Sequence, residues 1–292
     1  MSIDRLQEKI RRTKNPSVVD MTVHDTMVPT LIADQCADWA EAYLKYATEL
    51  METLRGHVPA LRFSFNSFAL RGEKGIATLQ KVLKRAQKMS YYVFLDAPEA
   101  LSADSAAQAA QLLLGEELDL AFDGVILTSY MGSDGMKPYA KLLAKAGKSL
   151  FVVIRTANKT APELQDLLTG SRLVYMAMAD VVNNLTSSAT GRSGFTAVGC
   201  AAAATSADSL KNLRSKYKNM FLFVDGYDSP SANAKICGNA FDSYGHGAIV
   251  CAGSSVTAAW REPDLCEEDY LLHALEAAAR MKKNLSKYVS IL

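Results

Sequence analysis

The sequence predicts a single (β/α)₈ barrel, and three observations lead to this fold class. Eight short, almost continuously apolar segments are spread along the 292 residues, as expected for strands of a parallel sheet that helices cover. Segments with helical periodicity lie between them, and no Pro-, Gly- or Ser-rich linker divides the chain. Right-handed crossovers close eight such units into a barrel. We therefore expect one domain over residues 1–292, with an N-terminal helix over 1–16 that leads into strand one.

The eight predicted strands are runs of apolar and β-branched residues. They cover residues 18–23, 60–66, 91–96, 124–129, 150–156, 196–202, 220–225 and 248–252. The intervening segments 34–55, 75–89, 103–114 and 206–217 carry apolar residues every three or four positions, which predicts helices with one buried face.

The connection from 156 to 195 is too long for a bare loop. Pro162, placed for a first helical turn, predicts that a helix opens at 161–163. A second apolar stretch, 173–182, predicts another helix before the next strand.

Composition excludes several classes of protein. A hydrophobic content of 49% with 22% charged residues is typical of a soluble globular chain and not of a disordered one. The net charge of +1 gives no electrostatic reason to expect nucleic acid or an anionic membrane as partner. No apolar run approaches the roughly 20 residues of a membrane span, and the charged N-terminus is not a signal peptide. The five scattered cysteines predict neither a disulfide framework nor a metal site, and we expect a cytoplasmic protein.

Several sequence blocks follow one another in the order of a known family. They are 6–10 with 15–19 near the N-terminus, 130–139 after strand four, 155–158 after strand five, 199–205, and 245–250 at the start of strand eight. Together they resemble the bacterial group 2 orotidine 5′-phosphate decarboxylases, and the block 130–139 is the most specific of them. The resemblance implies a barrel fold and a place in pyrimidine biosynthesis. We expect no cofactor.

The chain departs from this family at the positions that the resemblance assigns to catalysis. The family places a lysine after strand two and D-x-K-x-x-D after strand three, and an ammonium held by carboxylates stabilises and protonates the carbanion formed as carbon dioxide leaves. Here the first lysine position is Arg62, the first aspartate is kept as Asp96, the catalytic lysine is Pro98 and the second aspartate is Leu101. Proline has no proton to give, and arginine is a poor acid because its pKa lies above about 12.

Positions that the resemblance assigns to the nucleotide are also altered. The aspartate after strand one is Thr22, the pyrimidine-reading serine is Ala157, and the phosphate arginine falls at Ser254. The loop 225–231 carries Asp225 and Asp228, which should repel a phosphate, whereas the helix start at 253–255 offers backbone N–H groups to an anion. The candidate substrate-binding residues are Thr156, Asn158, Asp225, Asp228, Gly253 and Ser254.

Asp96 and Arg62 are the candidate catalytic residues, because the active sites of such barrels lie at the carboxyl ends of the strands. The alternative is a structural role, with the inherited carboxylate paired to the arginine of the neighbouring strand. Either way we predict that Asp96 and Arg62 point into the barrel mouth within ion-pair distance, since an unpaired buried charge is costly.

Other ionisable residues have weaker claims. His24 and Asp25, just after strand one, form a possible acid–base pair or a chance placement. His246 lies at the amino end of its strand, the stability face, and we expect no function for it. Asp225 and Asp228 with Asp96 are possible oxygen ligands, but solvated loop carboxylates are the alternative, and we predict no metal.

Three functions remain open. The first is a pseudoenzyme of the decarboxylase family with a binding, regulatory or structural role, paired with an active paralogue or another pyrimidine-pathway enzyme. The second is an active orotidine 5′-phosphate decarboxylase. The third is a barrel enzyme with altered chemistry on a non-phosphorylated small molecule. The resemblance also implies a two-fold dimer, and because Leu101 replaces a carboxylate at the family's seam, we predict a homodimer with residues 97–104 at its interface.

Overall fold

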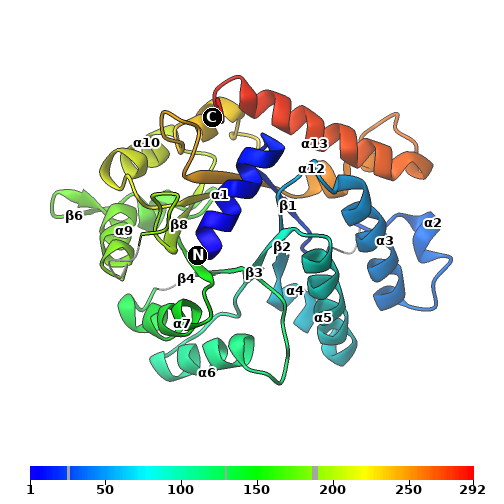
Figure 1. The fold of residues 1–292 in the computed structure, drawn as a ribbon, viewed down its shortest axis with the longest axis horizontal. Coiled ribbons are helices and arrows are strands. Elements are labelled where there is room, and N and C mark those ends of the chain that lie inside the picture. The colour runs from blue at the N-terminus through cyan, green and yellow to red at the C-terminus, as the bar shows by residue number, and fades with distance from the viewer. Residues whose placement is uncertain (25–26, 129, 186–189) are drawn as a thin grey trace.

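The protein is a closed barrel of eight parallel strands surrounded by helices in the computed structural model (Figure 1). The structure describes residues 1–24, 27–128, 130–185 and 190–292. The strands follow the order β1-β10-β9-β8-β5-β4-β3-β2 around the barrel, and each pairs in parallel with its neighbours. The predicted fold class is confirmed.

The bounds of the elements follow the predicted alternation. The barrel strands are β1 (Ser17–Asp20), β2 (Ala60–Ser64), β3 (Tyr92–Asp96), β4 (Gly124–Thr128), β5 (Ser149–Arg155), β8 (Val198–Ala203), β9 (Leu222–Asp225) and β10 (Ala248–Ala252). The helices are α1 (Ser2–Thr13), α2 (Thr30–Ala33), α3 (Trp39–Leu54), α4 (Phe65–Ala69), α5 (Gly72–Lys88), α6 (Ala103–Leu114), α7 (Ser133–Lys145), α8 (Pro162–Gln165), α9 (Val174–Asn184), α10 (Ala207–Lys216), α11 (Ala234–Gly238), α12 (Ser254–Thr257) and α13 (Tyr270–Ser286). Two 3₁₀ turns, η1 (Ala259–Arg261) and η2 (Glu267–Asp269), and a hairpin of β6 (Leu168–Thr169) with β7 (Arg172–Leu173) complete the described elements.

Polar side chains set where several helices begin. The predicted helix 34–55 starts at Trp39, because the Asp38 side chain accepts a hydrogen bond from the Glu41 amide, 3.0 Å away, and caps the helix. Ser102 caps α6 and Ser206 caps α10 in the same way. These caps satisfy backbone N–H groups that the first helical turn leaves unpaired.

Helix α1 closes the amino end of the barrel (Figure 1). Its side chains Ile3, Leu6 and Ile10 are fully buried and pack in one cluster with the aromatic residues inside the barrel. The carboxyl ends of the strands therefore form the other end, where polar side chains from neighbouring strands can meet.

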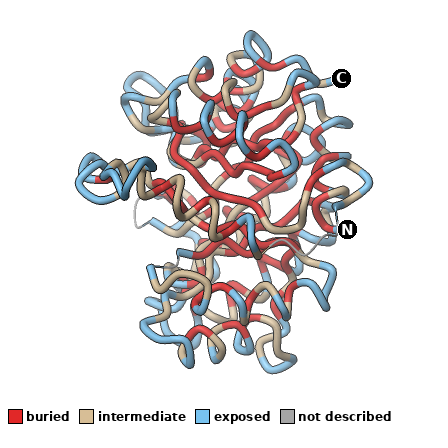
Figure 2. The backbone as a smooth tube through the Cα atoms, turned by 90° about the vertical axis from the view of Figure 1, so that its left-hand side faces the viewer, coloured by how far each residue is buried: buried red, intermediate tan, exposed pale blue. Residues whose placement is uncertain are grey.

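The barrel interior is a layer of phenylalanines beneath the carboxyl ends. The Phe94 ring makes edge-to-face contacts with Phe151 and Phe223, with centroids 5.4 and 5.0 Å apart. All three are fully buried, and Figure 2 shows the buried backbone concentrated in the interior of the molecule. We call this apolar layer the phenylalanine floor; the next inward-facing residues of the same strands lie directly above it, toward the carboxyl ends.

Two predicted strands end two or more residues earlier than expected. The predicted strand 18–23 stops at Asp20, because the Asp20 carboxylate accepts hydrogen bonds from the Thr22 amide and hydroxyl, at 2.9 and 2.5 Å, and turns the chain. The predicted strand 60–66 stops at Ser64, where α4 begins. The strands predicted at 196–202 and 220–225 begin two residues later, at Val198 and Leu222. The end of the predicted strand 124–129, Ser129, lies outside the described residues.

The connection between β5 and β8 contains more structure than the sequence indicated. The first predicted helix is one turn, α8, and the second is α9; the hairpin of β6 and β7 between them was not predicted. The block 130–139, which follows strand four, enters α7 at Ser133, and this helix tolerates Pro138 in its interior. Within the described residues, none of the helices combines the length and apolar character that a membrane span requires.

Candidate functional site

Four charged side chains meet at the carboxyl end of the barrel. Asp20, Asp96 and Asp225 are the last residues of β1, β3 and β9, and Arg62 lies in β2. Side chains alternate between the two faces of a strand, and the buried residues two positions before Asp96 and Asp225 are Phe94 and Phe223. The charged residues therefore form the layer directly above the phenylalanine floor. We call these four residues the carboxylate cluster.

The Arg62 guanidinium holds the carboxylate cluster together. Its Nε and Nη2 donate to the Asp96 carboxylate at 3.0 and 2.7 Å. Its Nη1 donates to both Asp225 oxygens, at 3.0 and 3.1 Å, and lies 3.5 Å from Asp20 Oδ2. The guanidinium carbon also lies 5.8 Å from the centre of the Phe223 ring. Each of its nitrogens thus has an acidic partner.

Burial and the neighbouring opposite charges shift the pKa values of Arg62 and Asp96 in opposite directions. Burial disfavours the charge of Arg62, but Asp96, Asp20 and Asp225 outweigh it and raise the pKa of Arg62 well above its ordinary value. Burial raises the pKa of Asp96 to about 6. Repulsion from Asp20 and Asp225 also raises it, whereas attraction to Arg62 lowers it. Three carboxylates around one guanidinium leave the cluster net negative when all are ionised.

The predicted ion pair between Arg62 and Asp96 is confirmed, whereas a role for either residue in chemistry stays a prediction. The predicted site does not include Asp20, because the predicted strand 18–23 runs past it and the resemblance assigns the aspartate after strand one to Thr22. The signal was present in the sequence. Asp20 shares an inward face with the buried Val18 and is the first polar residue after the apolar run.

We expect Asp225→Asn to lower the pKa of Asp96 from about 6, because the substitution removes one of the carboxylates that raise it. A carbon-detected NMR titration of the carboxyl groups measures this shift directly. Asp228→Asn is the matched control and should leave the pKa of Asp96 unchanged, since the Asp228 carboxylate bonds to other groups. An unchanged or higher pKa of Asp96 in Asp225→Asn would contradict the arrangement described.

Asp228 binds the start of α12. Its Oδ2 accepts hydrogen bonds from the backbone amides of Gly253 and Ser255, at 2.8 and 3.2 Å, and its Oδ1 accepts from the Ser255 hydroxyl at 2.5 Å. The amides that we predicted as a weak anion site therefore already bond a carboxylate of this chain. Ser254 itself is exposed.

The loop after β5 carries the predicted residues Thr156 and Asn158. The Thr156 hydroxyl lies 2.5 Å from Asn158 Oδ1, and the Thr156 amide donates to Gln165 Oε1 at 2.8 Å. A Cβ atom added to Gly226, whose φ is +76°, would lie 2.5 Å from the Ala157 Cβ atom. The loop after β5 is thus packed against the loop that follows Asp225.

The histidines are not part of the carboxylate cluster. His24 is exposed and lines a shallow hollow with Ser67, Leu70 and Arg71; its predicted partner Asp25 lies outside the described residues. His246 lies before β10, at the other end of the barrel, with Nε2 3.0 Å from the Leu292 carbonyl oxygen. Among the residues with described positions, no group of three or more His, Cys, Asp or Glu side chains has the arrangement of a metal site.

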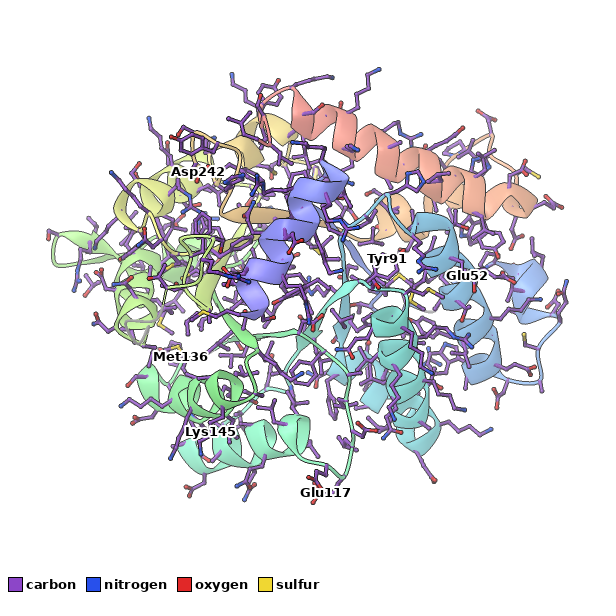
Figure 3. The ribbon with its side chains drawn as sticks, viewed as in Figure 1. Glu52, Tyr91, Glu117, Met136, Lys145 and Asp242 are labelled. Atoms are coloured by element: carbon purple, nitrogen blue, oxygen red, sulfur yellow. The ribbon has the colours of Figure 1, made fainter. Side chains whose placement is uncertain are left out.

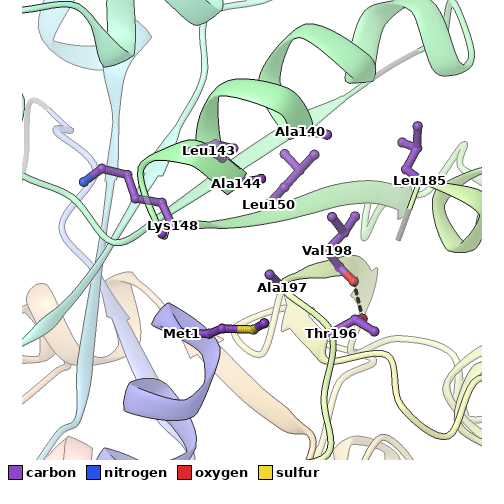
Figure 4. Close-up of a pocket in the computed structure, with 11 residues that line it drawn as sticks. Met1, Ala140, Leu143, Ala144, Lys148, Leu150, Leu185, Thr196, Ala197 and Val198 are labelled. Atoms are coloured by element: carbon purple, nitrogen blue, oxygen red, sulfur yellow. Dashed lines mark hydrogen bonds between the residues drawn. The ribbon is translucent and has the colours of Figure 1, made fainter. Parts of the chain in front are cut away.

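A cavity of about 160 Å³ lies away from the carboxylate cluster (Figure 4). It is lined mainly by apolar side chains of α7 and of the segments that enter β5 and β8, including Leu143, Leu150 and Val198. Among the described residues that line it, Lys148 has the one ionisable side chain, and its Nζ donates to the Phe122 carbonyl oxygen. The cavity adds no acid–base group to the cluster.

Known proteins resemble this chain over nearly its whole length. No protein-family model matches it. It is 25% identical over 288 residues to the orotidine 5′-phosphate decarboxylase of Clostridium acetobutylicum, covering 98% of this chain and 99% of that protein. It is 22% identical over 287 residues to the orotidine 5′-phosphate decarboxylase of Petrotoga mobilis, with 98% of each covered. This chain resembles the orotidine 5′-phosphate decarboxylases.

Solved orotidine 5′-phosphate decarboxylase structures show the same fold. The OMP decarboxylase of Leishmania donovani superposes with a TM-score of 0.73 at 22% identity, covering 98% of each chain. The orotidine 5′-monophosphate decarboxylase of Plasmodium berghei superposes with a TM-score of 0.73 at 13% identity, covering 97% of this chain and 99% of that one. At these identities the likeness is one of fold.

Pro98 and Leu101, the residues that the sequence resemblance predicts at the family's lysine and aspartate positions, lie beyond the end of β3. Pro98 is half-buried, and Leu101 is 94% exposed. Neither side chain can donate a proton or hold an ion. Within the described part of the chain, Arg62 is the cation paired with Asp20, Asp96 and Asp225.

Proposed function

We propose that this protein is an orotidine 5′-phosphate decarboxylase-like barrel that does not decarboxylate orotidine 5′-phosphate and acts as a binding, regulatory or structural subunit. One observation carries the proposal. The cation at the barrel mouth is Arg62, whose nitrogens are already bonded to Asp96 and Asp225 and lie near Asp20. A guanidinium is a poor proton donor because its pKa lies above about 12, and the positive charge of this one is already balanced by carboxylates of the chain.

The charge of the barrel mouth supports the same proposal. The carboxylate cluster is net negative, so it disfavours both a developing carbanion and a substrate phosphate. The backbone amides of Gly253 and Ser255 at the start of α12 already donate to the Asp228 carboxylate, so they are not available to the anion predicted there. An active enzyme would need a cation at one of these places.

Purified protein should release no carbon dioxide from orotidine 5′-phosphate above the background rate, because the proton-donating ammonium is absent. The enzyme of Clostridium acetobutylicum, assayed beside it, is the positive control. Pro98→Lys alone should remain inactive, since Leu101 and the carboxylate cluster are unchanged. A turnover number in the usual enzymatic range of about 1–10³ s⁻¹ would disprove the proposal.

A second candidate function is barrel chemistry on a non-phosphorylated small molecule. The specific observation is the pKa of Asp96, raised to about 6, because a carboxyl group poised near neutral pH suits general acid–base catalysis. A thermal-shift screen with nucleosides and sugar acids tests it, since a ligand that binds the native state raises Tm. A ligand whose effect disappears in Asp96→Asn would favour this candidate.

The proposed assembly is a homodimer with residues 97–104, after β3, at its interface, together with the neighbouring connections that lead from β2 to α5 and from β4 to α7. Each of these segments carries a large apolar side chain in contact with solvent: Leu70 is 87%, Leu101 94% and Tyr130 91% exposed. Apolar side chains on neighbouring loops are typical of a surface that another protein covers. A two-fold axis near Leu101 would place this surface against itself.

A further inference from the structure

A groove lies on the amino face of the barrel, at the end opposite the carboxylate cluster. It has a volume of about 370 Å³ and runs between α1 and the turns that lead into β2 and β3. Figure 3 labels Tyr91, one of its lining residues, in the region between α1 and α3. We call it the basic groove for the residues described next.

Of the described residues that line the basic groove, three are cations and none is an acid. Lys9 and Arg12 come from successive turns of α1, and Arg55 follows the end of α3. Among the residues that the structure describes, neither the Arg12 nor the Arg55 guanidinium has a carboxylate or hydrogen-bond partner. Lys9 Nζ donates to the carbonyl oxygen of Ser90, which is a neutral acceptor.

The described residues of the chain do not neutralise the positive charge of the basic groove. The pKa of Lys9 is lowered, first by burial and then by repulsion from Arg5 and Arg12, and the attraction of Glu8 does not compensate. Arg5 itself is paired with Asp123. An anion in the groove would relieve the repulsion among the remaining cations.

We propose that the basic groove binds a small multivalent anion of the phosphate class, such as a diphosphate group. Two planar guanidinium groups and an ammonium supply donors in the combination that phosphate oxygens accept, since arginine binds phosphate through paired N–H groups and lysine as a point charge. The site is separate from the barrel mouth, whose net negative charge repels the same ligand.

A small anion fits the basic groove better than a nucleic acid does. Single-stranded nucleic acids are bound by long basic tracks with exposed aromatic faces. The aromatic residue of this groove, Tyr91, is only 4% exposed, and the acidic residues Asp4 and Glu8 interrupt the basic surface of α1. Three cations around one groove suit a compact ligand with two or more charges.

Isothermal titration calorimetry with inorganic diphosphate tests the proposal on the full-length protein. Wild type should bind diphosphate, and its Tm should rise with the diphosphate concentration. The double variant Arg12→Ala/Arg55→Ala should bind at least about tenfold more weakly, because it loses both charge-assisted contacts. Both side chains are exposed, so the variant should keep the wild-type Tm in the absence of ligand.

The double variant Lys141→Ala/Arg280→Ala is the matched control, because it removes two exposed cations from α7 and α13 and so changes the net charge equally. It should bind diphosphate as wild type does. Equal weakening in both double variants would mean that diphosphate responds to net charge alone and would overturn the proposal. The absence of diphosphate binding to wild type would overturn it as well.

Discussion

Replacing Arg62 by methionine is expected to lower the free energy of unfolding by about 3–5 kcal/mol, the range found when one partner of a buried ion pair is removed. The Arg62 side chain is 16% exposed and is the cation paired with Asp20, Asp96 and Asp225 among the described residues. Methionine fills much of the same space but leaves the three carboxylates facing one another. At about 2–4 °C per kcal/mol for a chain of this size, Tm should fall by roughly 10 °C.

The loss of stability in Arg62→Met should increase as pH rises. Without the guanidinium, the pKa of Asp96 loses the attraction that lowers it and moves further above its unfolded value of about 4. The native state then binds more protons than the unfolded state, so this stability is present at low pH and is lost as pH rises through the native pKa of Asp96. Urea unfolding should therefore show a larger deficit near pH 8 than near pH 5. In wild type, Asp96 with its pKa of about 6 acts in the same direction.

Arg172→Met is the matched control for this substitution. Arg172 is 54% exposed and paired with Asp180 at 2.6 Å, so its loss should cost less than about 1 kcal/mol. Combining Arg62→Met with Asp96→Asn and Asp225→Asn should recover part of the stability, because it removes the repulsion that methionine exposes. If Arg62→Met lowers the free energy of unfolding no more than Arg172→Met does, the Arg62 guanidinium does not stabilise the carboxylate cluster as described.

The barrel was predictable from sequence because its strands carry a simple signal. Buried parallel strands are continuous apolar runs, and each of the eight predicted segments overlaps a barrel strand. The pair of Arg62 and Asp96 was predictable because the two residues interrupt neighbouring apolar runs, Arg62 within the run 60–66 and Asp96 at the end of the next. Helix α7 was missed because Pro138 and the glycines before it are typical of a loop, and packing of Met136 and Tyr139 against the core outweighs that local preference.

The carboxylate cluster was predicted only in part, because its geometry depends on where the strands end. The sequence placed Asp225 on a loop with Asp228, without indicating that one would bond Arg62 and the other the start of α12. The separation of these roles depends on a turn at Gly226, whose positive φ directs the chain away from β9. Such a turn is set by contacts between the loops after β5 and β9, which no single segment reveals.

Leu101→Lys is expected to convert the proposed homodimer into a monomer. A two-fold interface buries Leu101 of both subunits, which contributes about 3–6 kcal/mol per dimer at about 1.5–3 kcal/mol for each leucine. Losing that contribution weakens association by roughly 10²–10⁴-fold, and two facing ammonium groups add repulsion. Light scattering should give twice 31.7 kDa for wild type and 31.7 kDa for the variant at the same micromolar concentration.

Leu168→Lys distinguishes a specific interface from a general effect of adding charge. Leu168 is also an exposed leucine, at 73%, but it lies on the hairpin of β6 and β7, away from the connections after β2, β3 and β4. We expect this control to remain dimeric with an unchanged Tm. Because Leu101 is 94% exposed in the single chain, its replacement removes no contact within the subunit, so a change in mass without a loss of the fold reports on association. A wild-type protein that is monomeric at these concentrations, or a Leu101→Lys variant that stays dimeric, would show that the exposed leucine does not form the subunit interface.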